Sequence, residues 1–123
     1  MELPGKSIEG ARLVEIAEKI EKHINPYNKP YIELVGSWEK VDHEYMNTRL
    51  LKNYDEFYML YEHPVHSFKN RLSLVSKNEL IQFLQERINP DRMEGVDITV
   101  TNNKLKIFMI CNHDGDIYYI DEA

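Results

Sequence analysis

The sequence predicts an α+β protein, an antiparallel sheet with two helices on one face. Two segments have apolar residues at helical spacing, several short segments alternate as strands do, and turn signals separate the closing strands. In each half of the chain a helix precedes a group of strands, an order typical of α+β proteins. The length of 123 residues fits one domain, so we expect residues 1–123 to form a single α+β domain.

The first helix is predicted over residues 7–24. Ser7 offers a side-chain oxygen for an N-cap, and charged residues fill the face opposite the apolar stripe. Proline disfavours helical backbone in the residue before it, so Asn25-Pro26 ends the helix. The apolar stripe consists of Leu13, Ala17, Ile20 and Ile24.

The middle of the chain combines strands with one ambiguous segment. Strands are predicted over residues 31–36, 56–62 and 70–75. Residues 37–53 fit two interpretations, a helix capped by Ser37 or a strand over 45–51, and we favour the strand.

The second helix is predicted over residues 77–88. Ser76 and Glu79 have the capping-box pattern, in which each side chain accepts a hydrogen bond from the other residue's backbone N–H. Asn89-Pro90 ends this helix as Asn25-Pro26 ends the first. Three closing strands are predicted over residues 96–101, 104–111 and 116–121. Asn102-Asn103 and His113-Asp114-Gly115 between them favour two hairpins in series.

The two halves of the chain repeat one order of elements. Residues 15–26 and 79–90 are offset by 64 positions, both end in Ile-Asn-Pro, and strands follow each of them. One interpretation is a duplicated α-β-β-β unit, and the other is two unrelated helices with the same stop signal. The sequence pattern leaves both open.

Composition excludes several classes of function. The single cysteine, Cys111, cannot form an internal disulfide, which excludes a scaffold built on disulfides. The formal net charge is −6 and basic residues are scattered, so we expect no nucleic-acid partner. No apolar run approaches the roughly 18 residues of a membrane span, and the first residues lack the apolar core of a signal peptide. We therefore expect a cytoplasmic protein without a membrane partner.

The residues with catalytic or metal-binding chemistry form no recognisable signature. His63 and His66 are spaced as zinc ligands are, and Cys111 and His113 add a second pair, but a zinc site needs four ligands at defined spacings. We interpret the histidines as loop residues and Cys111 as a buried thiol. Glycine-rich phosphate loops and nucleophile motifs are absent from the sequence. We expect no enzyme activity, no cofactor and no metal.

The strands carry large apolar side chains on both faces, which is the most informative feature for function. On 104–111, Leu105 and Ile107 share the core face, whereas Phe108 and Ile110 share the other. A second apolar face needs a cover, supplied by a partner, by a second copy, or by residues 37–53 or 63–69. The candidate partner-binding residues are Trp38, Tyr58, Phe108, Ile110, Asp114, Asp116 and Tyr118.

We expect a protein-binding function. The first hypothesis is a stoichiometric inhibitor, such as a toxin-neutralising immunity protein, whose acidic surface meets a basic partner and occludes its site. The order of helices and strands also resembles that of type III secretion chaperones, a resemblance of architecture without a shared motif, which implies a homodimer joined through the apolar sheet face. A third hypothesis is an α+β domain that binds a small molecule or catalyses a reaction in a pocket between sheet and helices.

Overall fold

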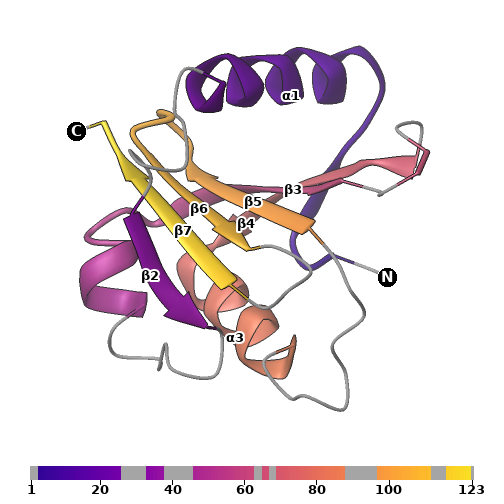
Figure 1. The fold of residues 1–123 in the computed structure, drawn as a ribbon. Coiled ribbons are helices and arrows are strands. Elements are labelled where there is room, and N and C mark those ends of the chain that lie inside the picture. Colours follow the sequence, from indigo (N-terminus) through magenta and orange to yellow (C-terminus); the bar gives the residue numbers. More distant parts are fainter. Residues whose placement is uncertain are drawn as a thin grey trace.

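The computed structural model describes residues 3–25, 33–37, 46–62, 65–66, 69–87, 97–111 and 116–122. Within these ranges, seven strands form one antiparallel sheet, with a helix on each side of it (Figure 1). The elements are β1 (Lys6–Ile8), α1 (Gly10–Ile24), β2 (Glu33–Ser37), the π-helical turn η3 (Met46–Leu50), β3 (Glu56–Glu62), β4 (Arg71–Ser76), α3 (Lys77–Arg87), β5 (Asp97–Asn102), β6 (Ile107–Cys111) and β7 (Asp116–Asp121). The α+β class is therefore confirmed.

The strands lie in the order β1-β4-β3-β5-β6-β7-β2. Every neighbouring pair is antiparallel, and β3 and β7 have the bounds that the sequence predicts. The N-terminal strand β1 forms one edge of this order and β2 forms the other. The segments 5–8 and 70–75 thus lie side by side although they are far apart in the chain.

The two helices cover opposite faces of the sheet, so their predicted placement on one face is wrong (Figure 1). One core cluster contains Leu80, Ile81, Phe83 and Leu84 of α3, together with Phe57, Met59, Ile98, Val100 and Met109 of the sheet. The other contains Ile16 and Ile20 of α1, together with Leu60, Leu72, Phe108 and Ile120. The physical reason is the second apolar sheet face: each apolar face of a sheet needs its own cover, and α1 supplies one.

The repeated order of elements does not extend to the pairing of strands. Strands β5, β6 and β7 form a consecutive meander, whereas β2 lies at the far end of the sheet from β3 and β4. In the described residues three strands follow each helix, but the middle strand expected in the first half is replaced by the π-helical turn η3, and β4 supplies the third strand. The two halves are therefore assembled differently.

Helix α1 begins later than predicted because residues 6–8 join the sheet. Ser7 pairs with Ser73 of β4 and is not the N-cap. Gly5 and Gly10 have positive φ values of 80° and 66°, a backbone region that glycine adopts freely. At Gly5 a Cβ atom would collide with the carbonyl oxygen of Leu74, so the close approach of β1 to β4 requires glycine there.

The start of α3 is as predicted. The Ser76 hydroxyl accepts a hydrogen bond from the Glu79 N–H at 3.2 Å, and the Glu79 carboxylate accepts one from the Ser76 N–H at 3.0 Å. These two bonds form the capping box. Hydrogen bonding of the Glu79 carboxylate to the backbone N–H and to the side chain of Ser76 holds the pKa of Glu79 below its ordinary value. The capping-box prediction is confirmed.

The segment before β3 contains a turn of π-helix over Met46–Leu50, so a strand over 45–51 is wrong. Residues 38–45 lie outside the described ranges. The Tyr119 hydroxyl donates to the Leu50 carbonyl at 2.7 Å, and the Lys77 ammonium donates to the carbonyls of Asn47 and Lys52. These bonds hold the π-helical turn against α3 and β7.

The turn between β5 and β6 is longer than predicted, because β6 begins at Ile107. Asn102 ends β5, and its buried side-chain oxygen accepts hydrogen bonds from the backbone N–H groups of Lys106, at 2.7 Å, and Ile107, at 3.0 Å. Leu105 has a φ of 54° in this turn. Asn102 therefore acts as a turn residue through its side chain.

Candidate functional site

Phe108 was expected at the centre of a partner surface, and this prediction is wrong for the folded chain. Its side chain is 0% exposed and lies in the cluster beneath α1. The His23 ring of α1 stacks on it, with ring centroids 5.4 Å apart. The cover is α1, which the sequence analysis had assigned to the other face.

The structure describes the side chains of only some of the other candidate residues. Tyr58, Ile110 and Tyr118 are half-buried on the same face as Phe108, and Ile110 lies directly opposite Tyr118 on the neighbouring strand. Asp116 begins β7, and its side chain lies outside the description. Trp38 and Asp114 lie outside the described residues. The structure thus brings three of the seven candidates to the partly covered margin of the α1 face.

Cys111 offers no nucleophile. Its thiol is fully buried in the cluster beneath α3, and burial raises its pKa to about 12. A thiol with this pKa stays protonated near neutral pH and does not react readily. Among the described residues, no group of three His, Cys, Asp or Glu side chains is placed to hold a metal ion. His66 is exposed, and His63 and His113 lie outside the described ranges.

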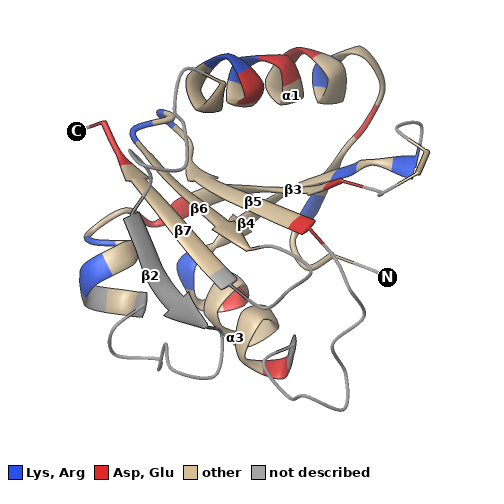
Figure 2. Ribbon diagram, in the orientation of Figure 1, with Lys and Arg blue, Asp and Glu red and all other residues tan. Residues whose placement is uncertain are grey.

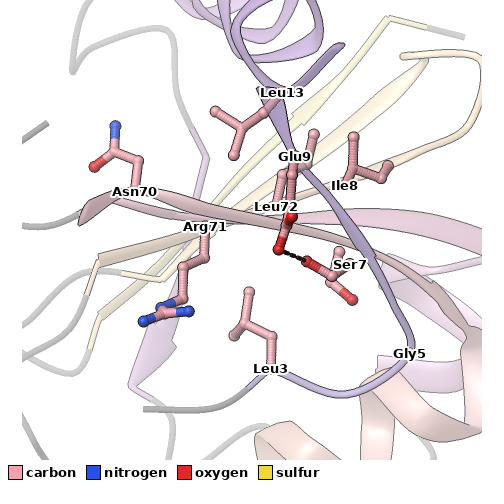
Figure 3. A pocket seen from close by; sticks show the side chains of 10 residues that line it. Leu3, Gly5, Ser7, Ile8, Glu9, Leu13, Asn70, Arg71 and Leu72 are labelled. Carbon is pink, nitrogen blue, oxygen red and sulfur yellow. Dashed lines mark hydrogen bonds between the residues drawn. The ribbon is translucent and has the colours of Figure 1, made fainter. Parts of the chain in front are cut away.

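A surface pocket is formed near the N-terminal end of the described residues. It lies where the N-terminal segment, β1, the start of α1 and β4 meet, and we call it the N-terminal pocket (Figure 3). Its volume is about 380 Å³. The lining residues are Leu3, Gly5, Ser7, Ile8, Glu9, Leu13, Asn70, Arg71, Leu72 and Ser73.

Local chain geometry explains why these residues meet. The turn at Gly5 lets β1 run against β4, and the Ser73 hydroxyl donates to the carbonyl of Pro4. Gly10 then turns the chain into α1, which places Leu13 above Leu72 of β4 (Figure 3). The pocket therefore depends on pairing between the N-terminal strand and a strand more than sixty residues later.

The walls of the pocket combine apolar and charged groups. Leu3 and Leu13 lie on opposite sides of it, the Glu9 side chain extends between them, and the Arg71 side chain lies to one side and points away from Glu9 (Figure 3). The Glu9 carboxylate accepts a hydrogen bond of 3.4 Å from the Ser7 hydroxyl. Arg71 is exposed and forms no ion pair within the described ranges. The pocket suits an apolar group that carries a polar or charged group beside it.

Two acidic residues of the sheet lie opposite each other on the face that α1 covers. Glu62 of β3 lies directly opposite Asp97 of β5. Partial burial raises the pKa of Glu62, and the negative charges of Glu21 on α1 and of Asp97 raise it further. The described surface of α1 carries both signs of charge, whereas the central strands are almost free of charge (Figure 2). The charge of Glu21 on the helix therefore disfavours the ionised form of Glu62 on the sheet.

Sequence reasoning missed the N-terminal pocket entirely. Gly5 and Gly10 were the available signals, because glycines on both sides of a short segment indicate backbone that other residues adopt only with strain. The three-residue strand between them is too short to be recognised by alternation. Its pairing with β4 is a non-local event, so Ser7, Glu9 and Arg71 could not be grouped in advance.

Comparisons with protein-family models, with curated proteins and with solved structures find no match to this chain. In the part of the chain that the structure describes, no helix has the length and apolar character needed to cross a membrane. The functional argument therefore rests on the fold and the N-terminal pocket.

Proposed function

We propose that this chain is a non-catalytic binding protein for another protein, of the stoichiometric inhibitor class to which immunity proteins belong. The observation that carries the proposal is the N-terminal pocket, whose lining mixes apolar side chains with polar and charged ones. At its rim Arg71 is exposed and forms no ion pair with another residue of the described ranges. A concave site that combines apolar contacts with a charged rim suits the anchoring side chain of a partner. The contact would thus be centred on β1 and β4 rather than on Phe108.

The charge of the chain supports the same reading. Its formal net charge of −6 favours encounter with a basic partner, because complementary charge accelerates association. Within this acidic chain, Arg71 places a positive charge at the pocket. It would bind an acidic or polar group of the partner there. An inhibitor needs no reactive group of its own, which accords with the buried, protonated thiol of Cys111.

The homodimeric chaperone alternative depended on the sheet face that contains Phe108. Helix α1 occupies that face in the folded chain, so the surface available to a second copy is limited to its margin at Ile110 and Tyr118. We therefore rank this alternative below the inhibitor.

The volume of the pocket favours one other candidate, the binding of a small molecule. About 380 Å³ lies in the lower part of the range found for ligand pockets. A small ligand and an anchoring side chain of a protein place similar demands on such a site, so the test has to separate them.

The test is affinity capture from the native source, followed by native mass spectrometry of the eluted complex. Wild type should retain a partner at a fixed stoichiometry, and Arg71→Glu should lose it because the substitution reverses the charge at the pocket rim. Arg12→Glu is the matched control, because Arg12 is equally an exposed arginine and does not line the pocket. It should retain the partner.

Two results would contradict the proposal. Equal retention of the partner by Arg71→Glu and by wild type would remove the pocket from the contact. If no protein co-elutes but small molecules shift the amide resonances of Ser7 and Leu72, the small-molecule candidate replaces the protein partner.

A further inference from the structure

The apolar residues beneath α1 form a cluster separate from the main core. The larger cluster joins α3 to one sheet face and contains no residue of α1. The smaller one joins Ile16 and Ile20 to the opposite face, with Leu13, Ala17 and Ile24 only partly buried. Removal of α1 from the sheet would therefore leave the packing of α3 intact.

The N-terminal end of α1 is weakly fixed. Its N-cap residue, Glu9, makes no side-chain capping hydrogen bond, and the first turn contains no acidic residue. This end of the helix therefore lacks the stabilisation that a side-chain cap supplies. A Cβ atom at Gly10 would meet nothing within 4 Å, so the backbone there is free of packing.

A polar contact fixes the C-terminal end of α1 in addition to the apolar packing of Ile20 and Ile24. His23 in the last turn contacts the Glu122 carboxylate with Nδ1 at 2.9 Å from Oε2, and its ring stacks on Phe108. Glu122 follows β7, so this contact ties the helix to the end of the chain. It joins α1 to a distant segment, whereas the Glu15–Lys19 pair lies within the helix on its outer side.

Opposing charges lie elsewhere on the same helix. The negative charge of Glu21 on the helix helps to raise the pKa of Glu62 on the sheet, so these two carboxylates repel each other across the contact. The His23–Glu122 contact and apolar burial therefore favour the packing of α1 on the sheet, whereas carboxylate repulsion opposes it.

We propose that α1 is a detachable cover, held over the Phe108 face by apolar packing and by the contact of His23 with Glu122, and opposed by repulsion between Glu21 of the helix and Glu62 of the sheet. In the open state the sheet and α3 remain folded, and the apolar residues Leu60, Leu72 and Phe108 become accessible. Opening also removes Leu13 from the N-terminal pocket, so a ligand that contacts Leu13 there would favour the closed state. The proposal does not depend on what the pocket binds.

The experiment is hydrogen exchange measured by mass spectrometry on the full chain, comparing peptides from α1 with peptides from α3. In wild type, α1 should exchange faster than α3. His23→Gln and Glu122→Gln should each accelerate exchange in α1 by about twofold to tenfold, the range expected for loss of one partly exposed pair and a ring contact. Exchange in α3 should stay unchanged. Glu62→Gln should slow exchange in α1, because it removes repulsion.

The control variant is Lys19→Gln, which breaks an exposed pair on the outside of α1 without touching the sheet. It should change exchange in α1 less than His23→Gln does. The proposal would be overturned if α1 and α3 exchanged at equal rates in wild type and if both rates changed together in every variant. That result would show that the two helices unfold as one cooperative unit. If His23→Gln destabilises the whole chain, the slowing expected of Glu62→Gln still decides the question, and its absence would also overturn the proposal.

Discussion

Phe108 lies in β6 under the ring of His23, with Thr101 and Ile120 opposite it on the two neighbouring strands. Its complete burial makes it a contributor to folding. The alternate-residue pattern of β6 showed which residues share a face, but not which helix covers that face, because that choice depends on contacts far apart in the chain. The burial of Phe108 therefore decides between the two interpretations of its sheet face, a partner-binding surface or a part of the core.

We predict that Phe108→Ala lowers the free energy of unfolding by about 3–5 kcal/mol, because it leaves a cavity between α1 and the sheet. Denaturant unfolding followed by circular dichroism measures the change. Val65→Ala is the control, since Val65 is 74% exposed and its truncation removes little buried surface. A loss at Phe108 as small as that at Val65 would mean that α1 does not cover this face in solution.

Glu62 provides a second residue-scale prediction, this time of pH dependence. Burial, Glu21 and Asp97 raise the pKa of Glu62, so the folded state holds this proton more tightly than the unfolded state does. Its contribution to stability is therefore favourable at low pH and is lost as pH rises from the ordinary value of 4.5 through the raised folded pKa.

Glu62→Gln should consequently stabilise the protein at pH 7, by a few tenths to about 1 kcal/mol because the site is partly exposed. The gain should vanish below about pH 4.5, where wild-type Glu62 is protonated in both states. Thermal melts of both proteins between pH 4 and pH 8 measure this. A gain that is independent of pH would show that ionisation of Glu62 is not its source.

At the scale of elements, local signals and distant contacts were predictable to different degrees. The capping box at Ser76 and Glu79 was readable because it lies within four consecutive residues and forms as expected. Strand β1 and the N-terminal pocket were not, because Lys6–Ile8 becomes a strand only by pairing with β4. The π-helical turn at Met46–Leu50 was missed for the same reason, since Tyr119 and Lys77 hold it from distant elements.

We predict that Ser76→Ala lowers the free energy of unfolding by about 1 kcal/mol, because the Glu79 N–H loses its side-chain acceptor. Urea unfolding measures the loss. Asn78→Ala is the matched control, because Asn78 is an exposed residue in the same helical turn. Equal effects of the two substitutions would mean that the capping bond contributes nothing in solution.

At the scale of the whole molecule, one sheet separates two unequal cores. The class could be predicted from periodicity, because strand and helix segments were recognisable one by one. The face of the sheet that each helix covers could not be predicted. Both helices have a suitable apolar stripe, and nothing in the sequence of either stripe indicates which face of the sheet it packs against. The larger core under α3 joins most strands, whereas α1 closes the smaller one and one wall of the N-terminal pocket.

The last prediction concerns metal, and it applies to the whole fold. In the described part of the chain no three ligating side chains converge, and the Cys111 thiol, with a pKa of about 12, does not ionise to bind a cation. If no metal contributes to folding, EDTA should leave the melting temperature unchanged, because chelation lowers stability only where metal binding is coupled to folding. Differential scanning calorimetry with and without EDTA tests this. A fall of many degrees, reversed by added zinc and abolished by His66→Ala, would instead place a structural metal at His66.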